Sequence, residues 1–157
     1  NKLLHDAFMN RRKTLKKEMG SRWSDEAHER WLFYSQSENE ELDKTCGKGF
    51  QPKQGDAETL RHGNGIYFVK EASFVDDFLS ASTADGSKRL LVCRVLTGKY
   101  DVGKPGTSPP VTQQTTGRSP VTVHTFVDSM EEPFVFVLPE NDGAMAYASY
   151  LVTYKMN

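Results

Sequence analysis

The stretch HGNGIYFVKEASF, residues 62–74, carries the strongest signal in the chain. Gly63 and Gly65 flank Asn64, and glycines in this arrangement let a backbone turn tightly and come close to a ligand. The letters IYFV that follow predict a strand, in which Tyr67 has a flat ring able to stack on a heteroaromatic group. No strand is predicted directly before the glycines and no third glycine follows, so the stretch is not a dinucleotide-binding fingerprint. A plain turn before a core strand is the alternative interpretation.

The segments on either side of this stretch predict helices and strands. Apolar residues recur at helical spacing over residues 1–20, and Gly20 stands where a C-terminal cap is expected. The segment SENEELDKTCGKGF, residues 37–50, predicts a second helix that ends at Gly47 and Gly49. The remaining expected elements are a short helix at residues 70–82 and strands at residues 30–35, 66–69, 89–100, 121–128, 133–139 and 146–155.

This order of elements predicts the α+β class, because a first helix is followed by mainly antiparallel strands with short helices between them. The segment 101–120 is rich in Pro and Thr and is expected to be an exposed loop. A chain of 157 residues is long enough to bury a core, so we expect a single domain over residues 1–157. Because the chain opens at Asn1 inside a helical pattern, we also expect this domain to be cut from a longer protein.

The composition argues against several classes of function. The 20 Lys and Arg are balanced by 21 Asp and Glu, which disfavours a dedicated nucleic-acid surface, and the basic run RRKTLKK is interpreted as a solvated helix face. No apolar run is long enough for a membrane span. Cys46 and Cys93 fit neither a metal-binding nor a redox spacing, which predicts reduced thiols in a cytosolic or nuclear protein. The histidines are scattered as well, so no metal site is predicted.

A series of motifs along the chain resembles one known family. In order these are LFYSQS, GKGF, HGNGIYF, the strand RVLTG, the pair FVDSMEEPFVFVLP, and AYASYLVTYK. Their order resembles that of the catalytic domain of the poly(ADP-ribose) polymerase (PARP) family, the diphtheria-toxin-like ADP-ribosyltransferases. The resemblance is closest to short members that transfer single ADP-ribose units. It implies an ADP-ribosyltransferase fold, with an N-terminal helix followed by mainly antiparallel split sheets.

The resemblance also implies a triad of site residues. The family uses His-Tyr-Glu, or His-Tyr with an apolar third residue, to hold the ribose and the nicotinamide of NAD⁺. Here Tyr34 stands at the His position and Tyr67 at the stacking Tyr, which is kept. Val135 takes the third position, with Phe134 as the alternative, because the register rests on matching Pro133. The triad is therefore interpreted as Tyr-Tyr-Val.

Further positions of the NAD⁺ pocket depart from the family pattern. Ser35 stands at the glycine whose backbone binds the nicotinamide amide, and Val75 stands at a serine. The family's aromatic residue falls on Phe78 or Leu79. The Tyr34 phenol is expected to project into the ribose space, or to fill the vacated pocket as a core residue. Each lost hydrogen bond to a positioned group costs about 1–3 kcal/mol, so these departures predict weakened NAD⁺ binding.

Two functional hypotheses follow, and Tyr34 divides them. The first is a domain without transferase activity that acts as a scaffold, since Tyr-Tyr-Val is similar to the pattern of an inactive antiviral member of the family. It implies protein partners, no bound cofactor, RNA contact only through other regions of the parent chain, and a cytoplasmic or nuclear location. The second is a weak mono-ADP-ribosyltransferase that uses NAD⁺, with Tyr67 stacking on the nicotinamide. A reader of nucleic acid or ADP-ribose through the basic first helix is a third, less supported hypothesis.

Overall fold

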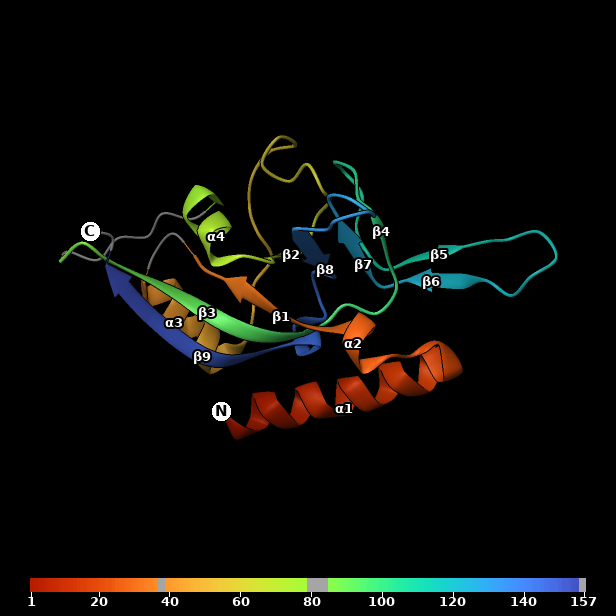
Figure 1. Cartoon of the computed structure of the whole chain (residues 1–157), viewed down its shortest axis with the longest axis horizontal. Coiled ribbons are helices and arrows are strands. Elements are labelled where there is room, and N and C mark those ends of the chain that lie inside the picture. The colour runs from red at the N-terminus through yellow and green to blue at the C-terminus, as the bar shows by residue number, and fades with distance from the viewer. Residues whose placement is uncertain (37–38, 79–84, 156–157) are drawn as a thin grey trace.

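A seven-stranded sheet forms the centre of the computed structural model, which describes residues 1–36, 39–78 and 85–155. The strands lie in the order β4-β7-β8-β2-β1-β3-β9, and all neighbours are antiparallel except β4 and β7 (Figure 1). This arrangement confirms the predicted α+β class. The strands are β1 (Glu29–Tyr34), β2 (Ile66–Val69), β3 (Ser87–Leu96), β4 (Tyr100–Val102), β7 (Thr125–Val127), β8 (Val135–Leu138) and β9 (Ala146–Lys155).

The sheet is divided at its centre into two halves. β1 pairs with β3 along its whole length, and β2 pairs with β8 along its whole length. Between β1 and β2, in contrast, a single register pair joins Phe33 to Val69. The sheet therefore splits at this joint, with β1, β3 and β9 on one side and β2, β8, β7 and β4 on the other. The strands that carry the predicted triad lie on both sides of the split.

Helix α1 (Lys2–Met19) lies along one side of the sheet (Figure 1). The Asn1 side chain caps its start, and Gly20 ends it with a φ of 57°, a conformation that favours glycine. Phe8 and Leu15 on its inner face are fully buried. The other helices are the 3₁₀ turns η1 (Gly20–Arg22) and η2 (Gly143–Met145) and the α-helices α2 (Asp25–His28), α3 (Asn39–Lys48) and α4 (Ala72–Phe78).

Charged contacts fix α1 against the sheet. The Glu29 carboxylate at the start of β1 accepts hydrogen bonds from Arg12 on α1 at 2.6 Å and from Arg94 on β3 at 2.6 Å. Arg11 pairs in the same way with Asp142, just before η2, at 2.8 Å. These pairs are partly buried, so solvent screens them less than exposed pairs. They set the orientation in which the apolar face of α1 meets the core.

Two apolar clusters lie on opposite faces of the central strands, because side chains alternate along a strand. Tyr34 and Phe68 belong to the cluster that α1 and α3 help to enclose. Tyr67, Val69 and Val135 belong to the other cluster, with α4. The first and second triad positions therefore direct their side chains to different faces of the sheet.

Four predicted boundaries were wrong. The expected strand 89–100 is two strands, because β3 ends at Leu96 and β4 begins at Tyr100. The segment 101–120, predicted as a loop, contains β5 (Val111–Gln113), which pairs with β6 (Val121–Val123) in a hairpin that projects from the sheet (Figure 1). The predicted strand 121–128 is broken at His124, because the His124 N–H donates to the Lys99 carbonyl outside either ladder. Gly47 lies inside α3, and Gly49 ends that helix with a φ of 98°.

The helix α1 contributes to stability through the buried Phe8 ring. Phe8→Ala is expected to lower the free energy of unfolding by about 3–5 kcal/mol, because it leaves a cavity in the larger cluster. Urea denaturation followed by circular dichroism measures this change. Leu3→Ala on the same helix is the control: Leu3 is 77% exposed, and the expected change is within about 0.5 kcal/mol. Equal losses in the two variants would contradict this packing of α1.

Candidate functional site

Hydrogen bonds to the loop that precedes β2 hold the Tyr67 ring in place. The Tyr67 hydroxyl donates to the Gly63 carbonyl at 2.6 Å and accepts from the His62 N–H at 3.3 Å. Burial raises the pKa of Tyr67 to about 12, so the phenol stays protonated at physiological pH. The polar end of this side chain is thus occupied, and what remains for a ligand is the face of the ring.

Lys53 covers a face of that ring. Its ammonium nitrogen lies 5.1 Å from the centroid of the Tyr67 ring, within the range of a cation–π contact. The Lys53 backbone N–H donates to the Gly65 carbonyl at 2.9 Å, which anchors the residue beside β2. Burial lowers the pKa of Lys53, and the nearby charge of Arg61 lowers it further. A protein cation therefore lies over the ring that the sequence resemblance assigns to nicotinamide stacking.

Tyr34 lies among core aromatic residues. Its side chain is 5% exposed, and its ring centroid lies 5.0 Å from that of Phe50 and 5.4 Å from that of Phe68. Burial raises the pKa of Tyr34 to about 12, although hydrogen bonds with the Thr45 side chain and with the backbone of Gln51 partly offset this effect. The phenol is consequently a buried core group on the face opposite the Tyr67 ring.

Ser35 has a partner within the protein. Its hydroxyl is buried at the end of β1 and donates to the Arg89 carbonyl at 2.9 Å. The next residue, Gln36, accepts a hydrogen bond from the Thr45 hydroxyl at 2.9 Å through its side-chain oxygen. These contacts connect the end of β1 to β3 and α3. Ser35, which the sequence resemblance aligns with a glycine, is thus tied to the neighbouring elements.

The remaining predicted site residues complete the second apolar cluster. Val75 on α4 and Val135 on β8 are both buried and share this cluster with Tyr67, and Val135 pairs with Val69 across the ladder. Phe78 is the last residue of α4, and its side chain lies outside the described part of the structure. Leu79, its alternative, also lies outside the described residues.

A cavity of about 20 Å³ is what these residues leave between them. That volume has room for about one water molecule, whereas sites for drug-sized ligands measure about 300–1,000 Å³. A ligand with a nicotinamide ring needs side chains to move before it can enter. The cavity is lined by Phe33, Tyr34, Ser35, Lys53, Tyr67, Val69 and Val75.

The two glycines before β2 are required by packing inside the protein. A Cβ on Gly65 would lie 2.0 Å from the Leu138 carbonyl oxygen, and one on Gly63 would lie 2.7 Å from the Phe126 ring. Both distances are far below ordinary contact. The close approach predicted from the glycine spacing is therefore made, but the partner is the backbone and core of the protein itself.

Lys53 is the site residue that sequence reasoning missed. It stands in the long polar segment 51–65, and a loop of that length is often functional. No local pattern distinguishes it from Lys48 or Lys70, however, because its role depends on a ring that follows fourteen residues later in the chain.

Comparison with known proteins gives the family. The chain matches the model of the poly(ADP-ribose) polymerase catalytic domain over residues 2–134. It is 33% identical over 129 residues to the protein mono-ADP-ribosyltransferase PARP10 of Mus musculus, a match that covers 81% of this chain and 13% of that protein. The chain therefore belongs to the PARP catalytic-domain family, whose substrate is NAD⁺. It spans about an eighth of the length of that relative.

A solved structure supports the same fold. The PARP domain of Arabidopsis RADICAL-INDUCED CELL DEATH1 superposes with a TM-score of 0.73 and 16% sequence identity, over 99% of this chain and 81% of that one. Within residues 1–36, 39–78 and 85–155, no helix is long and apolar enough to cross a membrane. In the same residues no group of three or more His, Cys, Asp or Glu is placed to hold a metal ion.

The contact between Gly65 and Leu138 gives a direct test of this packing. Gly65→Ala is expected to lower the free energy of unfolding by at least about 2–3 kcal/mol, because the added methyl forces β2 away from β8. The matched control is Gly47→Ala in α3, where no atom lies within 4 Å of the added Cβ. That change is expected to raise the free energy of unfolding by up to about 1 kcal/mol. Chemical denaturation measures the free energy of unfolding of both variants. An unchanged value for Gly65→Ala would contradict this packing.

Proposed function

We propose that this PARP-family domain lacks ADP-ribosyltransferase activity and serves as a scaffold for protein partners. The observation that carries the proposal is the cation over the Tyr67 ring in a cavity of about 20 Å³. The nicotinamide ring of NAD⁺ is itself cationic, so it must displace Lys53 to stack on Tyr67 and is repelled while the ammonium remains nearby. Binding of NAD⁺ thus carries a cost that an open pocket does not.

The residue at the family's His position supports the same proposal. Transfer of ADP-ribose depends on holding the ribose and the nicotinamide in one geometry, and loss of a positioning group is costly for such a reaction. Tyr34 packs against Phe50 and Phe68 on the opposite face of the sheet from Tyr67. Moving its phenol to a ribose would remove it from the core. The packing of Tyr34 against these rings instead adds to the stability of the fold.

We also propose a biological setting for this scaffold. The Tyr-Tyr-Val pattern is similar to that of the zinc-finger antiviral protein, which suggests a role in antiviral or RNA-related defence. In that role this domain contacts proteins, and any RNA is bound by other regions of the parent chain. The cytoplasm and the nucleus are the compartments that fit such a role and two reduced cysteines.

A weak mono-ADP-ribosyltransferase is the second candidate. It is favoured by the 33% identity to a relative named as a mono-ADP-ribosyltransferase, and by the retained Tyr67. In this alternative Lys53 swings away, Tyr67 stacks on the nicotinamide, and the apolar Val135 restricts the reaction to single transfers. The two candidates differ in whether the wild-type chain binds NAD⁺.

Thermal unfolding with and without millimolar NAD⁺ or 3-aminobenzamide separates the two candidates. A ligand at 100 times its dissociation constant stabilises the folded state by about 2.7 kcal/mol, which is a readily measured shift of the midpoint. We expect no shift with either compound for the wild-type chain, because the cavity is closed. A clear shift, together with automodification by labelled NAD⁺, would establish the transferase and overturn the scaffold proposal.

Replacement of Lys53 tests the physical cause of the closure. Lys53→Ala uncovers the Tyr67 ring, so 3-aminobenzamide is expected to gain at least about tenfold in affinity over the wild-type chain, equivalent to at least about 1.4 kcal/mol. Isothermal titration calorimetry measures the change. Lys104→Ala, which removes an exposed lysine, is the matched control and is expected to leave the affinity unchanged. Equal affinities of wild type and Lys53→Ala would show that Lys53 does not close the site.

A further inference from the structure

We propose that a second cavity, between the end of α1, α2 and the turn from β3 to β4, binds the phosphate group of a small organic anion. This cavity measures about 420 Å³ and shares no lining residue with the closed cavity beside Tyr67. Its polar groups come from Arg22, His28, Lys99 and His124, with Glu18 beside them. The proposal does not depend on whether the domain binds NAD⁺.

His124 presents a buried donor without a partner. The residue is 5% exposed, and its Nδ1 accepts a hydrogen bond from the Lys99 N–H at 3.1 Å. The proton of the neutral ring is therefore on Nε2. Among the described residues this nitrogen has no hydrogen-bond partner, and the nearest carboxylate oxygen, of Glu18, is 3.7 Å away. The Glu18 carboxylate covers this nitrogen and, against the larger effect of burial, acts to raise the pKa of His124. A buried N–H without a hydrogen bond is rare in folded proteins, so an acceptor from a ligand can take the place of Glu18 when that side chain turns out into solvent.

His28 has the same tautomer for the same reason. Its Nδ1 accepts a hydrogen bond from the Ser24 N–H at 2.9 Å, which assigns the proton to Nε2. In both imidazoles that line the cavity, Nδ1 thus accepts a hydrogen bond from the backbone and Nε2 carries the ring proton. A metal ion requires a ring nitrogen with a free lone pair, which neither Nε2 then provides. The tautomers therefore favour an anion over a metal cation in this cavity.

The turn between β3 and β4 is built around the His124 ring. A Cβ on Gly98 would lie 2.6 Å from His124 Nδ1, and Gly98 has a φ of 54°. The His124 N–H donates to the Lys99 carbonyl at 2.7 Å, and the Thr97 N–H donates to the His28 carbonyl at 2.9 Å. These contacts fix both rings relative to each other before any ligand arrives. Such preorganisation lowers the entropic cost of binding.

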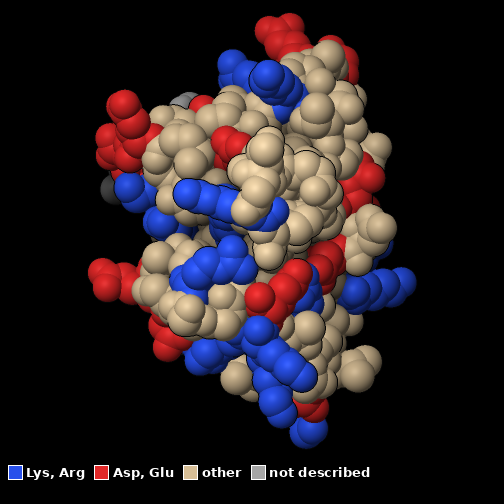
Figure 2. All heavy atoms as spheres, turned by 90° about the vertical axis from the view of Figure 1, so that its right-hand side faces the viewer, with Lys and Arg blue, Asp and Glu red and all other residues tan. Residues whose placement is uncertain are grey.

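The charges around the cavity fit an anion, with one opposing group. Arg22 and Lys99 are exposed, and Lys and Arg side chains gather, with acidic ones between them, on the lower part of the face in Figure 2, where the end of α1 lies. Burial lowers the pKa of both His28 and His124, so near neutral pH the positive charge comes from Arg22 and Lys99. The Glu18 side chain is 46% exposed and opposes an anion, but it is able to move into solvent.

The remaining walls suit the organic part of such a ligand. Met19, Pro120 and Val121 offer apolar surface, and Thr122 adds a hydroxyl. Small-molecule sites combine apolar surface with convergent polar groups, and here the three apolar residues lie beside six polar or charged ones. The volume is within the range of about 300–1,000 Å³ for such sites, and a cavity of this size favours a small phosphate ester over a polymer surface.

The probe for this proposal is inorganic phosphate, added at constant ionic strength and near neutral pH to the ¹⁵N-histidine-labelled chain. We expect saturable shifts of the Nε2 resonances of His28 and His124, and no such shifts when chloride replaces phosphate. His124→Asn is expected to abolish binding, because the Asn oxygen can replace the Nδ1 acceptor but supplies no donor at Nε2. Its unfolding midpoint shows whether the fold is retained. Shifts that do not saturate, or that chloride also produces, would overturn the proposal.

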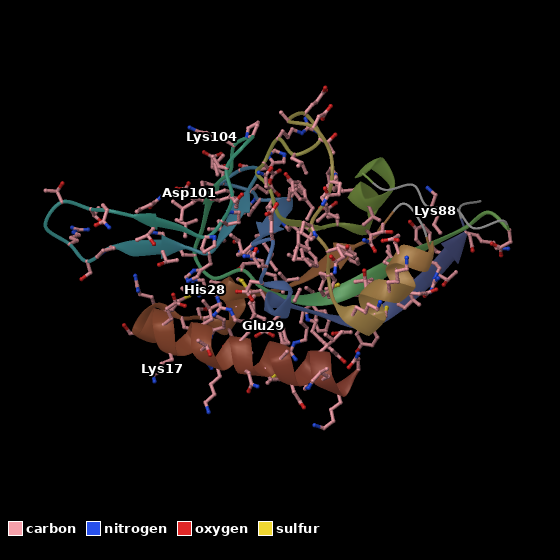
Figure 3. The ribbon with its side chains drawn as sticks, turned by 180° about the vertical axis from the view of Figure 1, so that it is seen from behind. Lys17, His28, Glu29, Lys88, Asp101 and Lys104 are labelled. Atoms are coloured by element: carbon pink, nitrogen blue, oxygen red, sulfur yellow. The ribbon has the colours of Figure 1, made fainter. Side chains whose placement is uncertain are left out.

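Charge variants make the test independent of His124. Arg22→Gln and Lys99→Gln are each expected to weaken phosphate binding roughly twofold to fivefold, the scale of an exposed charge pair, and Glu18→Gln is expected to tighten it. Lys17→Gln is the matched control, since Lys17 projects from the side of α1 opposite His28 and does not line the cavity (Figure 3). Loss of affinity with Lys17→Gln equal to that with Arg22→Gln would indicate general charge attraction instead of a site. Weaker binding with Glu18→Gln would also contradict an anion site.

Discussion

The two halves of the central sheet meet at one register pair, Phe33 opposite Val69, and the candidate site is arranged around this joint. Strands that part beyond such a joint leave a gap, which a protein must fill with side chains or with a ligand. In this chain side chains fill it. Tyr34 packs on one face of the sheet against Phe50 and Phe68, and on the other face Lys53 lies over Tyr67.

The side chains that fill this gap stabilise the folded domain and at the same time leave no open pocket there. A tyrosine buried among aromatic rings contributes apolar contact that an imidazole, being smaller and more polar, contributes less well. A lysine that lies on a tyrosine ring buries its aliphatic stem and keeps its charge against the ring. Each contact stabilises the domain, and in the scaffold proposal Lys53 occupies space that a nicotinamide ring would need beside Tyr67. The scaffold proposal rests on these contacts within the protein, which take the place of contacts to a ligand.

Much of the fold could be predicted because local signals agreed with the tertiary structure. The spacing of Phe8 and Leu15, with Asn1 and Gly20 at the ends, is sufficient to define α1. The letters IYFV after a glycine pair are sufficient to define β2 and to position Tyr67. The strand at Val111 was not predicted, because the prolines around it are typical of a loop and its pairing with β6 is a nonlocal contact.

The candidate site was harder to predict, because it depends on contacts between distant residues. Which face of the sheet receives the Tyr34 ring is set by the register of β1 against β2 and β3. The position of Lys53 follows from a bend of the loop that brings its backbone to Gly65. The tautomer of His124, which lies between β6 and β7, is fixed by the backbone N–H of Lys99, which lies between β3 and β4. None of these relations leaves a pattern in a single sequence.

The central claim is that the pocket beside Tyr67 is closed to NAD⁺ in the native chain. Saturation-transfer NMR on a mixture of the wild-type domain and NAD⁺ tests it most directly, because the nicotinamide protons report any stacking on a protein ring, including weak binding. The account predicts no transfer to those protons. Transfer to the nicotinamide protons that 3-aminobenzamide abolishes by competition would contradict it.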